Sequence, residues 1–239
     1  VNVKIIFVSA CRNAVANQDA LCASIDAQDD PRWEHVIIDD ASDNDLMMNN
    51  AANVDARRTF KLNPTRRWAL HNVVDAARQY EQHDDVIIAT VDGDDSLCND
   101  KTVGLVLSEY ERDQTLDVLW TGQQWDIDQR MNVSRAMPTH VDPYDWPWCA
   151  SHLRTWRAST LARVPDANFV DHDGHWFKRG YDQALMLPLL HVARARKYLP
   201  SVCYTYKMDS ASISLRDRPG TEVEQLSSIA FIRARGFVG

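Results

Sequence analysis

Short apolar runs alternate with longer segments of helical periodicity through the first half of the chain. Each run is nearly continuous in apolar residues, as expected for a strand that is buried on both faces of a sheet. The intervening segments place apolar residues three and four positions apart, which is typical of an amphipathic helix. Strands that alternate with helices predict a parallel sheet with right-handed crossovers. The predicted strands are residues 3–8, 36–38, 59–62, 86–91 and 117–120, and the predicted helices are 17–28, 63–80 and a segment around 103–110.

The second half of the chain is less regular. Proline and tryptophan are frequent between residues 131 and 148, which favours a long loop or lid. The spacing of apolar residues predicts helices at 151–163 and 182–197. Aromatic and β-branched residues at 202–206 predict a further strand.

The chain shows no repeat, low-complexity segment or linker. Thr221 and Glu224 form a capping-box pattern, which predicts a C-terminal helix. We therefore expect one α/β domain over residues 1–239. Its parts are a ligand-binding half at 1–120, a second functional half at 121–215 and the C-terminal helix at 216–239.

The composition is that of an ordinary globular protein, with 45% hydrophobic and 25% charged residues among 239. A net charge of −8 argues against strong non-specific binding to nucleic acid or anionic lipid. The five cysteines are scattered without a CxxC pair, so we expect reduced thiols and no zinc site. No apolar stretch has the length of a membrane span, and the first run leaves no room for a signal peptide. These features predict a cytoplasmic protein without a membrane span.

An acidic turn follows the fourth apolar run. Asp92, Asp94 and Asp95 surround Gly93 directly after residues 86–91. Crowded carboxylates repel one another, and their pKa values rise unless a cation neutralises them. Mg²⁺ and Mn²⁺ prefer hard oxygen ligands, and Gly93 lets the backbone turn so that the carboxylates converge. The turn therefore indicates a divalent metal bound to a diphosphate; the alternative is an acidic turn without a ligand.

Other polar residues share the same edge of the predicted sheet. In an open parallel sheet, ligands bind outside the carboxyl ends of the strands. Ser9 follows the first run together with Arg12 and Asn13, and residues 39–43 follow the second. The aspartates of that second segment can accept hydrogen bonds from a nucleobase or ribose, or can form an Asx turn.

At three places the sequence resembles the family 2 glycosyltransferases. Residues 36–44 are similar to the VDD-x-S-x-D segment of that family, residues 92–95 to its DxD motif, and residues 8–13 to its opening strand and loop. The order and spacing of the three match, and the resemblance covers most of residues 1–215. It implies the GT-A fold, a Rossmann-like α/β architecture with a mostly parallel central sheet flanked by helices and an irregular acceptor-side half. It also implies a nucleotide-sugar donor, with a UDP-sugar favoured.

The resemblance implies roles for individual residues. Asp94 would ligate Mn²⁺ or Mg²⁺ with Asp95 close by, while Asp40 and Asp92 would contact the nucleoside. A segment that resembles the ARN helix of the family would border the donor pocket. The expected nucleotide-sugar contacts are Ser9, Arg12, Asn13, Asp39, Asp40, Ser42, Arg67, Asn72, Asp92 and Gly93.

Asp182 resembles the aspartate of the ED motif of the family, at the start of a helix. Transfer needs a carboxylate base for the acceptor hydroxyl, and Asp182 is the candidate. The glutamate of the motif is replaced by Tyr181, and the alternative role of Asp182 is a helix cap. Many relatives also carry a histidine in a YR-x-H-x-x-S stretch. Residues 206–212 have none, and Asp209 or Lys207 is the expected substitute.

Residues 151–157 resemble the acceptor-side stretch that precedes the base. Arg154 and Arg157 are candidates for binding the diphosphate or an anionic acceptor, because guanidinium groups suit paired oxygens. A solvated helix face is the alternative. Trp156 belongs to a group of tryptophans in this half, one or two of which are expected to serve as platforms for a sugar or base.

The leading hypothesis is a metal-dependent glycosyltransferase that adds single sugars and, as the resemblance implies, inverts the anomeric centre. The acceptor remains open among glycan, lipid-linked sugar, protein, small molecule and modified DNA base. One alternative is a nucleotide-sugar-binding protein without transfer activity. Another, less favoured, is a sugar nucleotidyltransferase, since that class usually needs a glycine-rich phosphate loop and residues 9–13 contain no glycine.

Overall fold

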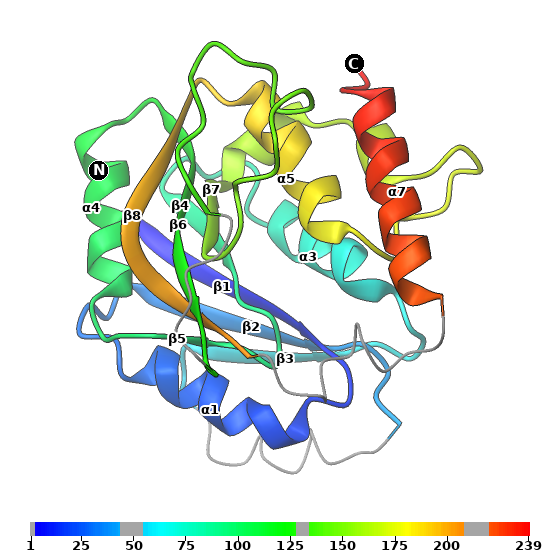
Figure 1. The fold of residues 1–239 in the computed structure, drawn as a ribbon. Helices are drawn as coiled ribbons and strands as arrows, with labels where there is room; N and C mark the ends of the chain where they lie inside the picture. Colours follow the sequence, from blue (N-terminus) through cyan, green and yellow to red (C-terminus); the bar gives the residue numbers. More distant parts are fainter. Residues whose placement is uncertain (1–2, 44–54, 128–133, 208–219) are drawn as a thin grey trace.

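The computed structural model describes residues 3–43, 55–127, 134–207 and 220–239. Its centre is an eight-stranded sheet in the order β3-β2-β1-β4-β7-β6-β8-β5 (Figure 1). The first four strands in this order are parallel, and β7 enters antiparallel between β4 and β6. The predicted α/β fold with a mostly parallel sheet is confirmed. The strands are β1 Lys4–Cys11, β2 Trp33–Asp39, β3 Arg58–Leu62, β4 Val86–Thr90, β5 Ser96–Leu97, β6 Leu116–Trp125, β7 Arg154–Arg157 and β8 Ala195–Tyr206.

Helices cover both faces of the sheet (Figure 1). Alternate residues of β1 point to opposite faces. Ile6 and Val8 are buried with residues of α3 and α5, whereas Ile5 and Phe7 are buried with residues of α1 and α4. Because both faces are covered, every position of the strand needs an apolar side chain, which explains the continuous run. The helices are α1 Val15–Asp26, α3 Trp68–Arg78, α4 Thr102–Arg112, α5 Tyr181–Val192 and α7 Thr221–Arg235.

One predicted helix is a strand. Residues 151–163 contain β7 and then a 3₁₀ helix, η2 (Ala158–Arg163), so the prediction of a helix there is wrong. β7 lies between β4 and β6, and all four of its side chains are buried on the two faces of the sheet, so no alternation of polar and apolar residues marks it. Arg154 pairs with the last residue of β4, and Arg157 pairs with a residue near its start. The two arginines therefore lie about 10 Å apart along the strand instead of on one helical face.

The next helix and strand divide differently from the prediction. α5 ends at Val192, and the chain from Ala195 onwards belongs to β8, which continues through the predicted strand at 202–206. The buried carboxylate of Asp117 accepts hydrogen bonds from the backbone amide and the guanidinium of Arg194, each at 2.7 Å. These bonds hold the turn between α5 and β8. Their acceptor, Asp117, lies in β6, far from this turn in the sequence, so the sequence around residue 194 does not predict where the helix ends.

The other predicted helices and strands correspond to elements of the structure, except that α3 begins at Trp68 and not at Asn63. Residues 134–148 form no helix or strand, as expected for a long loop. α7 is the predicted C-terminal helix. Within the described ranges, no helix combines the length and the apolar character needed to cross a membrane.

Arg157 stabilises the fold and does not lie at the edge of the sheet where the ligand is expected. It is 2% exposed, and its guanidinium donates hydrogen bonds to the backbone carbonyls of Leu116 (3.2 Å), Tyr110 (3.4 Å) and Asp84.

Arg157→Met should leave these buried acceptors without a donor, so we expect the free energy of unfolding to fall by about 2–4 kcal/mol. Urea unfolding measures this. The matched control is Arg112→Met, whose exposed side chain should matter by less than about 0.5 kcal/mol. Equal stability of Arg157→Met and the control would contradict the assignment.

Candidate functional site

A cleft of about 260 Å³ opens at the carboxyl ends of β1 and β4. One wall comes from the ends of β1 and β2 and from the acidic turn at residues 92–95, and the other from β7 and the start of α5. The cleft therefore joins the two halves that the sequence predicts to bind the donor and the acceptor. The predicted site residues that line it are Arg12, Asp40, Asp92, Gly93, Asp94, Arg154 and Asp182.

Gly93 lets β1 and the acidic turn approach each other closely. A Cβ atom at this position would lie 2.5 Å from the sulfur of Cys11 and 3.2 Å from its Cα. The sequence indicates glycine here for a sharp turn. The structure adds a packing reason, because any side chain would push the turn away from β1.

Asp92 sits in a buried network with Arg154 and Tyr181. Its Oδ1 lies 3.4 Å from Arg154 Nη2 and also accepts a hydrogen bond from the Tyr181 hydroxyl. The same hydroxyl accepts a bond of 2.7 Å from Arg154 Nη2. Burial alone would raise the pKa of Asp92, but the charge of Arg154 and the Tyr181 hydrogen bond hold it below its usual value. Asp92 is therefore a carboxylate with its own cation.

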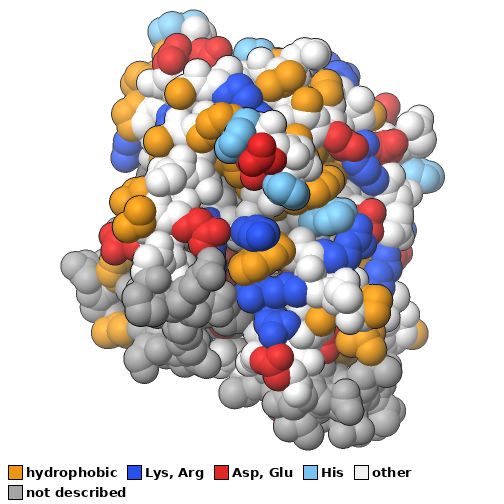
Figure 2. Space-filling model, turned by 90° about the vertical axis from the view of Figure 1, so that its right-hand side faces the viewer, with side chains coloured by type: hydrophobic (Ala, Val, Ile, Leu, Met, Phe, Trp, Pro, Cys, Tyr) orange, Lys and Arg blue, Asp and Glu red, His pale blue; other side chains and the backbone are white. Residues whose placement is uncertain are grey.

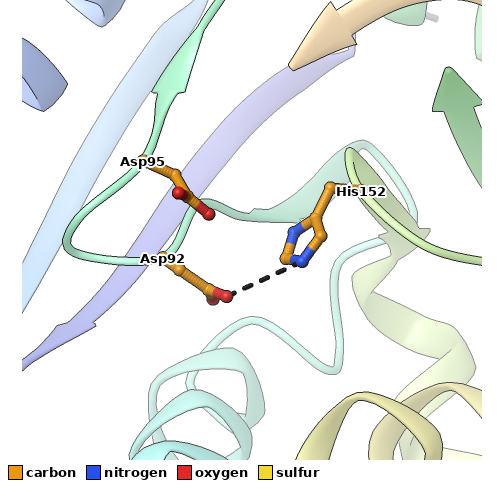
Figure 3. A group of neighbouring side chains, drawn as sticks. All are labelled: Asp92, Asp95 and His152. Atoms are coloured by element: carbon orange, nitrogen blue, oxygen red, sulfur yellow. Dashed lines mark ion pairs between the residues drawn. The ribbon is translucent and has the colours of Figure 1, made fainter. Parts of the chain in front are cut away.

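His152 lies across from Asp92, in the segment before β7 (Figure 3). Burial, assisted by Arg154, lowers the pKa of His152 to about 3, so its imidazole is neutral near pH 7. Nδ1 is 3.0 Å from Arg154 Nη2. A guanidinium can only donate, so Nδ1 is the acceptor and the ring proton sits on Nε2. Nε2 lies 3.7 Å from Asp92 Oδ2, beyond hydrogen-bond range.

Asp95 ties the acidic turn to β8. Its carboxylate oxygens accept hydrogen bonds from the Tyr204 hydroxyl (2.7 Å) and the Lys207 backbone amide (2.8 Å). Burial, together with the nearby charges of Asp92 and Asp94, raises its pKa well above the usual value. Asp95 is close to Asp94, as the resemblance implies, but it is not among the residues that line the cleft.

Two groups of described residues could hold a metal ion by residue type and distance. Asp92, Asp95 and His152 form the first, within 4.8 Å of one another (Figure 3). Most of its possible ligand atoms are already engaged, because Asp92 Oδ1 and both oxygens of Asp95 accept hydrogen bonds. The imidazole of His152 carries a proton on the nitrogen that faces Asp92. The cleft still fits a hard cation, because Asp94 and Asp92 both line it and offer carboxylate oxygens. The second group is the exposed turn of Asp171, Asp173 and His175, away from this cleft.

Asp40 positions the start of α3. Its carboxylate accepts hydrogen bonds from the backbone amides of Arg67 (2.7 Å) and Trp68 (2.8 Å) and from the Asn63 side chain (3.0 Å). Burial raises its pKa, but hydrogen bonds, first that of the Arg67 amide, lower it overall. The predicted helix start at Asn63 is therefore wrong, because Asn63 serves Asp40 and the helix begins at Trp68. Trp68 has φ +69°, an unfavourable conformation that these bonds hold at the cleft wall.

Several predicted contacts lie behind the cleft wall. Asn72 accepts a hydrogen bond from Asn63, and the Arg67 side chain pairs with Asp75. Asp39 accepts hydrogen bonds from the backbone amide and hydroxyl of Ser42, three residues on, which is a local turn one residue longer than an Asx turn. These residues shape the wall without lining the cleft.

The other predicted residues have different surroundings. Ser9 is fully buried and is hydrogen-bonded to His35. Asn13 is exposed beside the cleft and binds Asp43. The structure does not bring Trp156 or Arg157 to the cleft, since Trp156 is core and Arg157 lies at the far end of β7. Asp209 lies outside the described residues.

Asp182 faces the cleft from the first turn of α5. Gly180, with φ +66°, allows the chain to turn into the helix just before it. Burial raises the pKa of Asp182, with Arg154 opposing and Asp92 adding to the effect. A carboxyl group with a raised pKa that lines the same cleft as Asp94 is suited to accept a proton.

The sequence singles out Arg154, but it does not predict that Tyr181 and His152 lie beside Asp92 or that basic side chains surround Trp68. Tyr181 replaces a glutamate, and a phenol can still bridge a cation and a carboxylate; its adjacency to Asp182 was the available signal. Arg66 is close to Trp68 in the sequence, whereas Lys178 and Arg179 come from a distant segment and gave no local signal. On the face formed by α3 and α7, Figure 2 shows Lys and Arg side chains gathered around hydrophobic surface. The basic residues on the cleft wall beside Trp68 are Arg66, Lys178 and Arg179.

Comparison with known proteins places this cleft in a known fold. No protein-family profile and no curated protein matches the chain. Solved structures do match. S. aureus TarS is 17% identical over 95% of this chain, with a TM-score of 0.64. Its fragment 1–349 in complex with UDP-GlcNAc is 15% identical over 99%, with a TM-score of 0.68. The mannosyltransferase PcManGT from Pyrobaculum calidifontis, in complex with GDP-Man and Mn²⁺, is 15% identical over 100%, also with a TM-score of 0.68.

The chain has a GT-A fold. It spans 39% of the TarS chain, 68% of the TarS fragment and 66% of PcManGT. At these identities the likeness establishes the GT-A fold and leaves donor, acceptor and mechanism to the residues of the cleft.

The close approach at Gly93 generates a prediction. Gly93→Ala should displace the acidic turn from β1, because the Cα of Cys11 is backbone and cannot rotate away. We expect a loss of roughly 1–3 kcal/mol in the free energy of unfolding, measured by urea denaturation. The control is Gly104→Ala, where the nearest atom is 3.8 Å away and alanine favours the helix. If Gly93→Ala proves as stable as the control, the packing explanation is wrong.

Proposed function

We propose that the chain is a metal-dependent glycosyltransferase that moves a sugar from a nucleotide sugar to an acceptor hydroxyl. One observation carries the proposal. In a GT-A fold, the acidic turn and Asp182 line the same cleft, although they come from separate segments, the turn after β4 and the start of α5. Membership of family 2 and inversion of the anomeric centre are part of this proposal.

The proposed displacement needs a base and a neutralised leaving group. The acceptor oxygen bonds to the anomeric carbon as the bond to the diphosphate oxygen breaks, and the hydroxyl proton passes to Asp182. A bound Mn²⁺ or Mg²⁺, held by Asp94, would supply Lewis-acid neutralisation of the diphosphate. Arg154 adds a fixed positive charge beside Asp92.

The donor half would bind the nucleotide. We assign the nucleoside to the wall formed by Arg12 and Asp40 at the ends of β1 and β2. Asp40 acts there chiefly through Trp68, whose amide it holds. The similar structures include complexes with UDP-GlcNAc, with UDP, and with GDP-Man and Mn²⁺, so UDP- and GDP-sugars are the donors to test first.

Separate substitutions distinguish the metal ligand from the base. Asp94→Asn should weaken Mn²⁺-dependent binding of the nucleoside diphosphate by roughly 10–100-fold, measured by calorimetry. Asp182→Asn should keep that binding within about threefold and lower transfer by roughly 10²–10⁴-fold. Transfer is measured as release of nucleoside diphosphate from the donor with a panel of acceptors. Full transfer by Asp182→Asn would remove it as the base. A wild-type protein that binds donor with metal but turns over no acceptor would favour the binding-only alternative.

The raised pKa of Asp182 predicts the pH dependence of transfer. Asp182 must be deprotonated to accept the hydroxyl proton, and burial moves its deprotonation to higher pH than that of an exposed aspartate. We therefore expect kcat/KM to rise as the pH rises through the pKa of Asp182, and to be low at pH values below that pKa. The control is nucleotide binding over the same pH range, which separates proton transfer from donor affinity. An acid limb at the pH of an ordinary exposed carboxylate would contradict the assignment.

A further inference from the structure

Among the described residues, His152 and Arg154 each carry a hydrogen-bond donor that has no acceptor within hydrogen-bond range. Arg154 is 0% exposed, and its buried Nη1 has no hydrogen-bond partner among the described residues. Nε2 of His152 carries the ring proton, and its nearest acidic oxygen, Asp92 Oδ2, is 3.7 Å away. Both residues line the cleft. A buried donor without an acceptor costs free energy unless a ligand, ion or water completes it.

Arg154 and Tyr204 fix the orientation of the His152 ring. Arg154 donates to Nδ1 at 3.0 Å, and the ring stacks on Tyr204 with centroids 4.4 Å apart. The stacking and the hydrogen bond together prevent the ring from exchanging its two nitrogens. Nε2–H is therefore a preorganised donor, comparable to the fixed donors that stabilise developing charge in active sites.

A role as metal ligand does not fit this arrangement. A metal needs an unprotonated ring nitrogen, but Nδ1 is occupied by Arg154 and Nε2 carries the proton. The third member of the same cluster, Asp95, already accepts hydrogen bonds at both oxygens. Nε2–H of His152 instead suits an oxygen of an anion that lies next to the acidic turn, with the buried charge of Arg154 close by.

We propose that Nε2–H of His152 donates a hydrogen bond to a phosphate oxygen of the bound nucleotide sugar. Arg154 fixes the tautomer of His152 and places a positive charge behind it. This inference rests on the proposed function, because the leaving diphosphate is the anion that such a transferase brings to the acidic turn. Hydrogen bonds to charged phosphate oxygens are stronger than those between neutral groups, so the effect should be measurable.

Two conservative variants test the donor. In His152→Asn the side-chain oxygen can still accept from Arg154, but the amide ends at the position of Nδ1 and offers no donor at that of Nε2. In His152→Gln the longer side chain returns an N–H to that position. The ligands are UDP with uridine, or GDP with guanosine, according to which diphosphate the wild type binds with Mn²⁺. Calorimetry gives their affinities, and electron paramagnetic resonance gives Mn²⁺ binding without nucleotide. Thermal unfolding checks that each variant is folded.

We expect His152→Asn to lose about tenfold in affinity for the diphosphate and His152→Gln to recover most of it. Affinity for the nucleoside and nucleotide-free Mn²⁺ binding should match wild type in both. Unchanged diphosphate affinity in His152→Asn would overturn the proposal. An equal loss for nucleoside and diphosphate would show that His152 only shapes the pocket, and lost Mn²⁺ binding would make it a ligand. If the wild type binds neither UDP nor GDP with Mn²⁺, the proposed function fails and takes this inference with it.

Discussion

The ion pair between Arg154 and Asp92 is the interaction on which the site depends. Aspartates of the acidic turn and of α5 meet at one end of the sheet, where burial makes their mutual repulsion costly. Arg154 is wholly buried, so its charge also has to find a partner or the strand that carries it could not enter the sheet. Asp92 provides that partner from the neighbouring strand end. The pairing therefore satisfies both charges and fixes the register of β7 against β4.

The same network joins the two halves of the cleft. Tyr181 bridges Arg154 and Asp92 with its hydroxyl, and it is also the first residue of α5. The next residue is Asp182, so the position of the candidate base is tied to that of the acidic turn. The resemblance to family 2 implies a glutamate at position 181, but the tyrosine present supplies a hydrogen bond that a carboxylate beside Asp92 could make only against charge repulsion.

Much of this architecture follows from local signals. Continuous apolar runs located β1, β2 and β4 because strands buried on both faces need such runs, and the polar residues after them located the cleft. The acidic turn and Asp182 were found as candidates by motif. β7 was not predicted because its burial depends on β4 and β6, and because two of its four residues are arginines, which do not indicate a buried strand. The tautomer of His152 depends on Arg154 across a bend, and the role of Asp40 depends on amides that follow β3; neither is encoded in a local pattern.

The buried guanidinium of Arg154 also changes how much charge a metal ion has to neutralise at the acidic turn. Crowded carboxylates predict a neutralising cation, and a metal bound to diphosphate is one source. Here the protein supplies another, since Asp92 is neutralised by Arg154, while Asp95 is hydrogen-bonded by Tyr204 and the Lys207 amide. The protein therefore neutralises part of the charge of the turn without a metal, although the charges of Asp92 and Asp94 still raise the pKa of Asp95. A divalent ion would then be needed for the charge that the nucleotide brings, and its affinity should be coupled to nucleotide binding rather than to folding. On this view Asp94 lines the cleft as the ligand of a cation that arrives with its substrate.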